Sequence, residues 1–191
     1  MTRIIAGRAG GTRLDVPDRG TRPTSERVRE SLFGALESAD AIEGSRILDL
    51  YAGSGALGLE ALSRGGASID LVEKAGSAAS VAQRNATRVA TVVGAQARVH
   101  RTGVQQFLRQ TAAGYDLVFT DPPYDLPDAD MDEDLRLLAP HLHPDALVVV
   151  ERGKRAGEPD WASAGLEQVR SRVYGDTAVW WAQPLAASQS A

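Results

Sequence analysis

The stretch Arg46-Ile47-Leu48-Asp49-Leu50-Tyr51-Ala52-Gly53-Ser54-Gly55-Ala56-Leu57-Gly58 decides the fold. A short apolar run ends in an acid, and a glycine-rich turn and an apolar segment with helical spacing follow it. Gly53 and Gly55 let the backbone turn sharply and approach a ligand, and Gly58 allows close packing of a helix on a strand. The stretch predicts a strand, a tight loop and a helix whose N-terminal N–H groups face a nucleotide-like ligand.

Two acids narrow the chemistry of this ligand. Asp49 lies at the carboxyl end of the first strand, where a carboxylate repels phosphate and attracts a cationic amino group. Glu73 ends a second apolar run 24 residues after Asp49, where it can accept both hydroxyls of a ribose. An amino site, a glycine loop and a ribose site together fit S-adenosylmethionine better than NAD, because S-adenosylmethionine has an amino-acid end, a ribose and no phosphate.

Length and composition predict one domain, with at most a small appendage, for these 191 residues. Hydrophobic residues make up 43% of the chain, which is ample for a core, and no apolar run approaches the roughly 20 residues of a membrane span. The N-terminus lacks the apolar centre of a signal peptide. The chain contains no cysteine, which excludes disulfides, thiolate metal sites and cysteine nucleophiles. These features favour a cytoplasmic protein.

Positive charge is concentrated at the N-terminus of an acidic chain. The formal net charge is −4, yet residues 1–30 contain seven arginines and four acids, and residues 31–191 contain 14 basic and 21 acidic residues. A basic arm on an acidic body indicates a localised anionic partner. A solvated basic hairpin without a partner is the alternative.

Hydrophobic periodicity predicts alternating strands and helices. The expected strands are 46–50, 69–73, 97–101, 115–120 and 146–151, and the expected helices are 25–39, with Thr24 as its cap, 56–64, 76–91, 103–112 and 130–139. Continuous apolar strands that alternate with helices predict a parallel sheet covered on both faces. The acids Asp130, Asp132, Glu133 and Asp134 are expected to form a solvated helical turn.

Strand-like runs at both ends of the chain complete the expected α/β architecture. The runs 166–174 and 177–183 predict an antiparallel hairpin that closes the sheet, and the runs 2–6 and 12–16 predict an N-terminal hairpin. We expect a basic hairpin and loop over 1–23, a Rossmann-like domain over 24–184 and a disordered tail over 185–191.

The most specific motif is Asp121-Pro122-Pro123-Tyr124, directly after an expected strand. Ligands of doubly wound sheets bind at the carboxyl ends of the strands where the strand order reverses, so Asp49 and Asp121 should face one crevice. Methylation of an exocyclic amine needs acceptors that localise and aim the nitrogen lone pair. The Asp121 carboxylate and the Pro122 carbonyl supply two, and Tyr124 can stack on a flipped base. An ordinary Asp-Pro-Pro turn is the alternative.

The glycine loop and the Asp-Pro-Pro-Tyr motif together resemble the class I S-adenosylmethionine-dependent methyltransferases that act on exocyclic amines. The longer strings Arg22–Phe33 and Asp49–Gly65 are similar to one family, the bacterial 16S rRNA guanine-N2-methyltransferases, and the resemblance covers residues 3–183. It implies a seven-stranded, mostly parallel sheet and methylation of one guanine of 16S rRNA, guanine 966, in the small ribosomal subunit or its assembly intermediate.

The resemblance also implies roles for individual residues. The expected cofactor residues are Asp49, Tyr51, Ala52, Gly53, Gly55, Glu73, Lys74, Thr102, Gly103, Val104 and Asp121. The expected catalytic residues are Asp121, Pro122, Pro123 and Tyr124. Phosphate binding by guanidinium groups predicts an RNA face made of Arg3, Arg8, Arg13, Arg22, Arg27 and Arg29. Two departures are Tyr51, where the family usually has phenylalanine, and the lack of an acid near Thr102 for the adenine amino group.

Three other functions stay open. A DNA adenine-N6 methyltransferase shares the motif, but such enzymes generally carry a target-recognition insertion for which this chain has no room. An NAD-dependent oxidoreductase would leave Asp49 and the Asp-Pro-Pro-Tyr turn without a role. A catalytically silent ribosome-assembly protein could retain the fold.

Two histidines, His141 and His143, lie close together in the sequence but lack a third ligand nearby, so we expect no metal site. We also expect a monomer.

Overall fold

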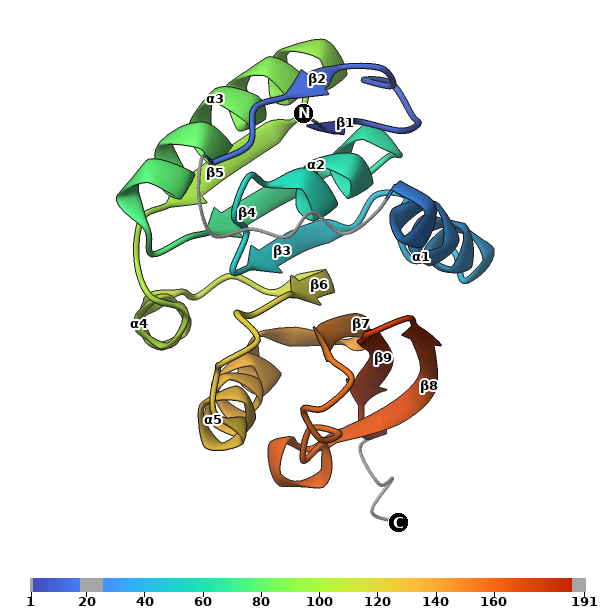
Figure 1. The fold of residues 1–191 in the computed structure, drawn as a ribbon, viewed down its shortest axis with the longest axis vertical. Helices are drawn as coiled ribbons and strands as arrows, with labels where there is room; N and C mark the ends of the chain where they lie inside the picture. The colour runs from blue at the N-terminus through green and yellow to red at the C-terminus, as the bar shows by residue number, and fades with distance from the viewer. Residues whose placement is uncertain (1, 18–25, 187–191) are drawn as a thin grey trace.

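The computed structural model describes residues 2–17 and 26–186. Its centre is a seven-stranded sheet with the order β5-β4-β3-β6-β7-β9-β8 (Figure 1). The strands are β3 (Arg46–Leu50), β4 (Ser68–Val72), β5 (Gln96–His100), β6 (Tyr115–Thr120), β7 (Leu142–Gly153), β8 (Leu166–Tyr174) and β9 (Thr177–Pro184). The first five are parallel, whereas β9 pairs antiparallel with β7 and with β8. The predicted parallel sheet with a closing hairpin is confirmed.

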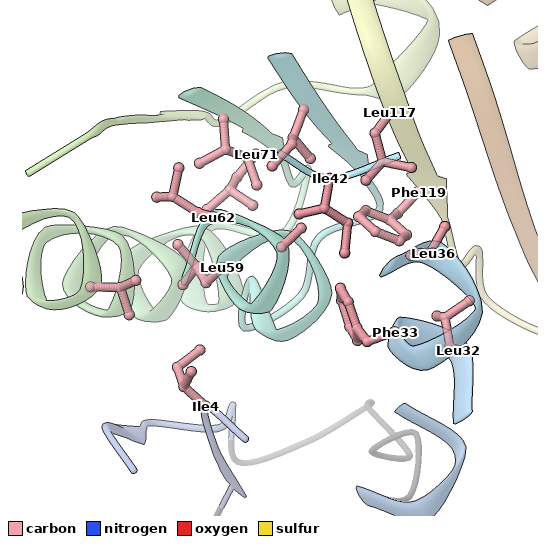
Figure 2. Packing of buried hydrophobic residues seen from close by; sticks show 14 of the residues in the cluster. Ile4, Leu32, Phe33, Leu36, Ile42, Leu59, Leu62, Leu71, Leu117 and Phe119 are labelled. Carbon is pink, nitrogen blue, oxygen red and sulfur yellow. The ribbon is translucent and has the colours of Figure 1, made fainter. Parts of the chain in front are cut away.

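Helices cover both faces of the sheet. They are α1 (Glu26–Ser38), α2 (Ala56–Ser63), α3 (Gly76–Val93), α4 (Val104–Gln110) and α5 (Asp128–Leu138), with two short 3-10 turns, η1 (Ala139–His141) and η2 (Ala162–Ala164). Because side chains alternate along a strand, Ile47 packs in a cluster with α1, α2 and α3, and Leu48 packs in a second cluster with α4 and α5. Figure 2 shows the first cluster, in which Phe33 of α1 lies beside Phe119 of β6 with ring centroids 5.9 Å apart.

The tryptophan pair in β9 follows the same alternation. Trp181 belongs to the cluster on the α1 side and Trp180 to the cluster on the α5 side, as their adjacent positions in a strand predict. None of the helices in the described ranges is long and apolar enough to cross a lipid bilayer.

The N-terminal hairpin forms a separate two-stranded sheet. Its strands, β1 (Thr2–Arg3) and β2 (Arg13–Leu14), pair antiparallel, as predicted, but are shorter than the sequence pattern suggests. Ile4 and Leu14 are buried in the cluster that also contains α2 and α3. A Cβ at Gly7, whose φ is +82°, would lie 2.1 Å from the Ser63 carbonyl oxygen, so this close approach to α2 requires glycine.

Side chains of α2 and α3 form hydrogen bonds with backbone groups of the hairpin and of the segment after it. The Glu60 carboxylate accepts hydrogen bonds from the amides of Ile5 at 2.7 Å and Ala6 at 3.0 Å, although Glu60 is fully buried. Asn85 is also fully buried; its amide group donates to the carbonyls of Asp15 and Ser54, both at 2.9 Å. Asn85 therefore ties the segment after β2 to the glycine loop after β3.

Candidate active site

An open cleft of about 1370 Å³ lies along the carboxyl ends of the central strands. Among its lining residues are Asp49, Tyr51, Ala52, Gly53, Glu73, Lys74, Thr102, Gly103, Val104, Asp121, Pro122, Pro123 and Tyr124. The fold thus brings the expected cofactor residues and the expected catalytic residues into one cleft, at the ends of β3, β4, β5 and β6. Gly55 does not line the cleft: it caps α2 with φ 79°, and a Cβ there would lie 3.1 Å from the side chains of Leu59 and Leu71.

Asp49 is buried directly beneath the start of α2. Its Oδ2 accepts a hydrogen bond from the Gly58 amide at 2.9 Å, and only 2% of the residue is exposed. A Cβ at Gly58 would lie 2.1 Å from Ile69 Cδ1 and 3.0 Å from Asp49 Oδ2, so the close approach of α2 to Asp49 requires glycine. Burial raises the pKa of Asp49 to about 7, the Gly58 amide opposes the rise, and the charge of Glu73 adds to it. A cationic group in the cleft would favour the ionised form.

Glu73 joins the end of β4 to the glycine loop. One carboxylate oxygen accepts a hydrogen bond from the Gly53 amide at 2.9 Å, and the other accepts one from the Ala75 amide at 2.6 Å. Each oxygen has a second lone pair for a ligand hydroxyl. The carboxylate is therefore held in a fixed position at the cleft wall.

Tyr51 connects the loop after β3 to α5. Its backbone is left-handed, with φ 63°, which is uncommon for a residue other than glycine, and its hydroxyl donates to Asp134. Asp134 is only 1% exposed, so the expected solvated acidic turn is wrong at this position. The pKa of Asp134 is raised, chiefly by burial. Spacing within α5 identifies Asp134 as part of the helix but does not reveal that a tyrosine 83 residues away covers it.

The Asp-Pro-Pro-Tyr segment follows β6 and lies against β7. Asp121 has its pKa raised well above the usual value by burial and then by the negative charges of Glu151 and Asp49. Tyr124 is 56% exposed, and its ring covers Gly153, where a Cβ would lie 2.7 Å from Tyr124 Cδ1. An exposed ring three residues after the half-buried Asp121 carboxylate can offer a stacking surface near a hydrogen-bond acceptor.

Sequence reasoning missed Glu151 as a residue of the cleft. It lies near the end of β7, is 7% exposed and lines the cleft beside Asp121. The available signal was an acid that follows the apolar run at 147–150, the same pattern that identified Asp49 and Glu73.

The predicted arginine face is only partly exposed. Arg3, Arg8 and Arg13 are exposed on the N-terminal hairpin. Arg29 is 2% exposed, and its Nη2 donates to Thr2 Oγ1 and to the Arg3 carbonyl, both at 3.0 Å, so its assignment to an exposed face is wrong. Arg29 points inward from α1 and ties that helix to β1. Arg22 and the Arg27 side chain lie outside the described residues, as does the expected helix cap Thr24.

The two histidines near β7 have ordinary structural contacts. His141 Nε2 lies 2.8 Å from the Leu108 carbonyl oxygen, and His143 Nδ1 lies 2.6 Å from Asp116 Oδ1. Within residues 2–17 and 26–186, no group of three His, Asp or Glu side chains is arranged to hold a metal ion.

Comparisons with known proteins identify the family of this chain. The model of the family described as "Conserved hypothetical protein 95" matches residues 2–183. "Ribosomal RNA small subunit methyltransferase D" of Escherichia coli (strain K12) is 39% identical over 179 residues, which are 92% of this chain and 86% of that protein. The solved structure of the "putative methyltransferase yhhF" from Escherichia coli has a TM-score of 0.81 at 38% identity and covers 97% of this chain and 99% of that one.

A more distant structure supports the fold class. Magnesium protoporphyrin IX methyltransferase from Synechocystis PCC 6803, solved with bound S-adenosylmethionine, has a TM-score of 0.68 at 14% identity and covers 86% of each chain. The sheet order and these matches define a class I methyltransferase fold with a small N-terminal hairpin sheet. The chain belongs to the family described as "Conserved hypothetical protein 95", in which it is a homologue of ribosomal RNA small subunit methyltransferase D.

Proposed function

We propose that this protein transfers a methyl group from S-adenosylmethionine to the exocyclic N2 amine of a guanine in 16S rRNA, the target being guanine 966 by family resemblance. The observation that carries the proposal is the meeting of two sites in one cleft, the Asp49 and glycine-loop site at β3 and the Asp-Pro-Pro-Tyr segment at β6. The names of the relatives support rRNA as the substrate.

The residues of the cleft fit the proposed cofactor. The buried Asp49 carboxylate suits the amino group of the methionine end, and the Glu73 carboxylate suits the ribose hydroxyls. Thr102 Oγ1 is buried at the cleft wall and has no hydrogen-bond partner among the described residues, so it can serve a polar atom of the adenine ring. When bound, S-adenosylmethionine supplies an electrophilic methyl carbon on a sulfonium, and S-adenosylhomocysteine is its product.

The chain contributes orientation and charge to the transfer. The Asp121 carboxylate and the Pro122 carbonyl accept hydrogen bonds from the two N–H groups of the amine, which localises the nitrogen lone pair and directs it into the cleft. Tyr124 stacks on the flipped base and fixes its plane. Positive charge develops on the nitrogen during transfer. The Asp121 carboxylate stabilises this charge and accepts the proton that the nitrogen releases.

The exposed hairpin arginines give the proposed RNA partner a phosphate-binding surface. Arg3, Arg8 and Arg13 lie on the hairpin, and Asn85 ties Asp15, which directly follows the hairpin, to the glycine loop, so RNA bound on the hairpin would lie near the cofactor cleft. The proposed partner is the small ribosomal subunit or its assembly intermediate, and we expect the protein to act in the cytoplasm as a monomer, without a metal.

The decisive experiment incubates the protein with methyl-labelled S-adenosylmethionine and small subunits that lack this modification, followed by mapping of the label. Label on N2 of guanine 966 in 16S rRNA is the expected result. Label on adenine of duplex DNA or on another RNA would replace the substrate and keep the chemistry. Cofactor binding without any label on these substrates would favour a catalytically silent assembly protein.

A further inference from the structure

The cleft contains one more buried carboxylate than the proposed transfer uses. In the parallel pairing of β6 and β7, Thr120 is opposite Val150, so Asp121 and Glu151 follow at the same level. Glu151 is 7% exposed and lines the cleft. The Asp121 carboxyl has its pKa raised by Glu151 more than by Asp49, which indicates that the Glu151 charge lies close to the transfer site. The proposed function assigns Glu151 no role in cofactor binding or in proton acceptance.

Glu151 lies on the same face of β7 as the stacking ring. Residues two apart in a strand point to the same face, so Glu151 points to the side on which a Cβ at Gly153 would point. That Cβ would lie 2.7 and 3.1 Å from two carbons of the Tyr124 ring. Tyr124, Asp121 and Glu151 therefore surround one space, and a base stacked on Tyr124 would present its edge to both carboxylates.

The hydrogen-bonding groups on the edge of the base determine whether a second carboxylate attracts or repels that base. In guanine, N1, one of the two ring nitrogens beside the N2 amine, carries a hydrogen, whereas the ring nitrogen next to the amine of adenine or cytosine carries a bare lone pair. A carboxylate accepts a hydrogen bond from the guanine N1–H but repels a lone pair, because an ionised carboxylate has acceptors only. Asp121 and Pro122 alone can serve any exocyclic amine, so a second acceptor beside them would select guanine.

We propose that Glu151 is the residue that selects guanine, by accepting a hydrogen bond from N1–H while Asp121 holds the N2 amine. This inference rests on the proposed function, since it assigns the base specificity of the same site. It makes Glu151 a specificity-determining residue that touches the substrate but does not take part in methyl transfer.

The test uses 2-aminopurine, which keeps the amine of guanine but has no hydrogen on N1. Small subunits are reconstituted on ligated 16S rRNA with guanine or 2-aminopurine at the target position, and kcat/KM is measured on both. The wild-type protein should prefer guanine roughly 10- to 100-fold. Glu151→Gln should bring the preference to within about threefold, because its amide N–H can bond to the bare N1 while its rate on guanine falls.

Two further variants control for folding and for charge. Glu151→Asp keeps a carboxylate and should keep a preference for guanine, at a reduced rate. Glu167→Gln, on the exposed face of β8, should leave both rates unchanged. Melting temperature and S-adenosylmethionine binding are measured for each variant. If Glu151→Gln does not fold, the proposal is tested with Glu151→Asp. Loss of the preference for guanine over 2-aminopurine in a folded Glu151→Asp variant overturns the proposal.

The outcomes separate this inference from the proposed function. A folded Glu151→Gln variant with the wild-type preference, or with an equal loss of rate on both bases, overturns the specificity role and leaves the transfer intact. Absence of label from the wild-type protein on guanine-containing subunits, despite cofactor binding, overturns the proposed function and this inference together.

Discussion

The cleft and the N-terminal hairpin both depend on buried acids, but they use these acids in opposite ways. Beneath the hairpin, the fully buried Glu60 of α2 accepts hydrogen bonds from two backbone amides of the hairpin and from Arg64 Nε at 2.8 Å. In the cleft, burial and neighbouring negative charge raise the pKa values of Asp49 and Asp121. The acid beneath the hairpin is satisfied by the protein itself, whereas the acids of the cleft have their ionised forms disfavoured by burial and by neighbouring negative charge.

This difference predicts opposite effects on stability. Removing a satisfied buried acid leaves its partners without acceptors and destabilises the fold. Removing an acid whose charge is disfavoured by burial stabilises the fold and weakens ligand binding instead. The same kind of side chain is therefore expected to serve structure in one region and ligand binding in the other.

Glu60→Ala should have the largest effect, on stability. We expect the free energy of unfolding to fall by about 3–5 kcal/mol, because the Ile5 and Ala6 amides and the Arg64 guanidinium lose a buried acceptor. Urea denaturation measures this loss. Glu37→Ala removes the exposed partner of the same arginine and should cost less than about 1 kcal/mol. Equal effects of the two substitutions would contradict the contrast.

Asp121→Ala should have the largest effect on catalysis. We expect kcat to fall roughly 100- to 1000-fold, because the nitrogen loses the carboxylate that aims its lone pair and stabilises its developing charge. Binding of S-adenosylmethionine, measured by calorimetry, should stay detectable. Asp145→Ala, an exposed acid in β7, is the control and should keep the wild-type rate. A substantial rate in Asp121→Ala would remove the motif from the mechanism.

Asp49→Asn should stabilise the protein at neutral and alkaline pH. Burial raises the pKa of Asp49 from its ordinary value of 3.8 to about 7 in the folded state, so folding favours its protonated form. The wild-type protein has the full benefit of that form below about pH 4 and loses it as the pH rises through 7. Above pH 7 the variant should gain roughly 2–4 kcal/mol in free energy of unfolding.

The same variant should bind S-adenosylmethionine more weakly, since a neutral amide does not attract the amino group. Urea denaturation of both proteins between pH 4 and pH 8 tests the stability change, and calorimetry tests the binding. A stability difference that does not grow with pH would show that Asp49 ionises freely in the folded state.

Neutralising Arg3, Arg8 and Arg13 together should have the smallest effect at physiological salt. Each lost phosphate contact lowers the slope of log affinity against log salt by about 0.7–0.9, so replacing all three with glutamine should reduce the slope by about 2. Filter binding of small subunits over a range of salt concentrations measures this slope. If the slope and the affinity stay unchanged, the RNA face lies elsewhere on the protein.

A matched set of arginines outside the hairpin controls for net charge. Arg109, Arg136 and Arg170 are exposed on α4, α5 and β8. Replacing them with glutamine changes the net charge by the same amount and should leave the salt slope near the wild-type value.

Local sequence was sufficient for most of the fold and for the two motifs of the cleft. The order strand, glycine turn, helix at Asp49–Gly58 is encoded within a few residues, because turn geometry and periodicity are short-range properties. The Asp121 motif was predictable for the same reason. The parallel pairing of β3 with β6 brings the ends of both motifs to one edge of the sheet, at the place where α/β sheets reverse their strand order.

The errors at Arg29 and Asp134 share one cause. Both residues carry charge and were expected on the surface, yet both are nearly fully buried because a distant segment covers them. Arg29 meets the backbone of β1, and Asp134 meets the hydroxyl of Tyr51. Charge predicts exposure only on average, since a buried charged group can be stabilised by hydrogen bonds.

The sequence by itself determined the class of fold, the glycine loop and the Asp-Pro-Pro-Tyr segment, because glycine, proline and alternating apolar residues restrict the backbone locally. Only the tertiary structure placed Glu151 beside Asp121, 30 positions earlier in the chain, and joined Asp15 to the glycine loop through Asn85. These contacts depend on strand register and helix docking, which are set by the packing of the whole core and not by any one segment.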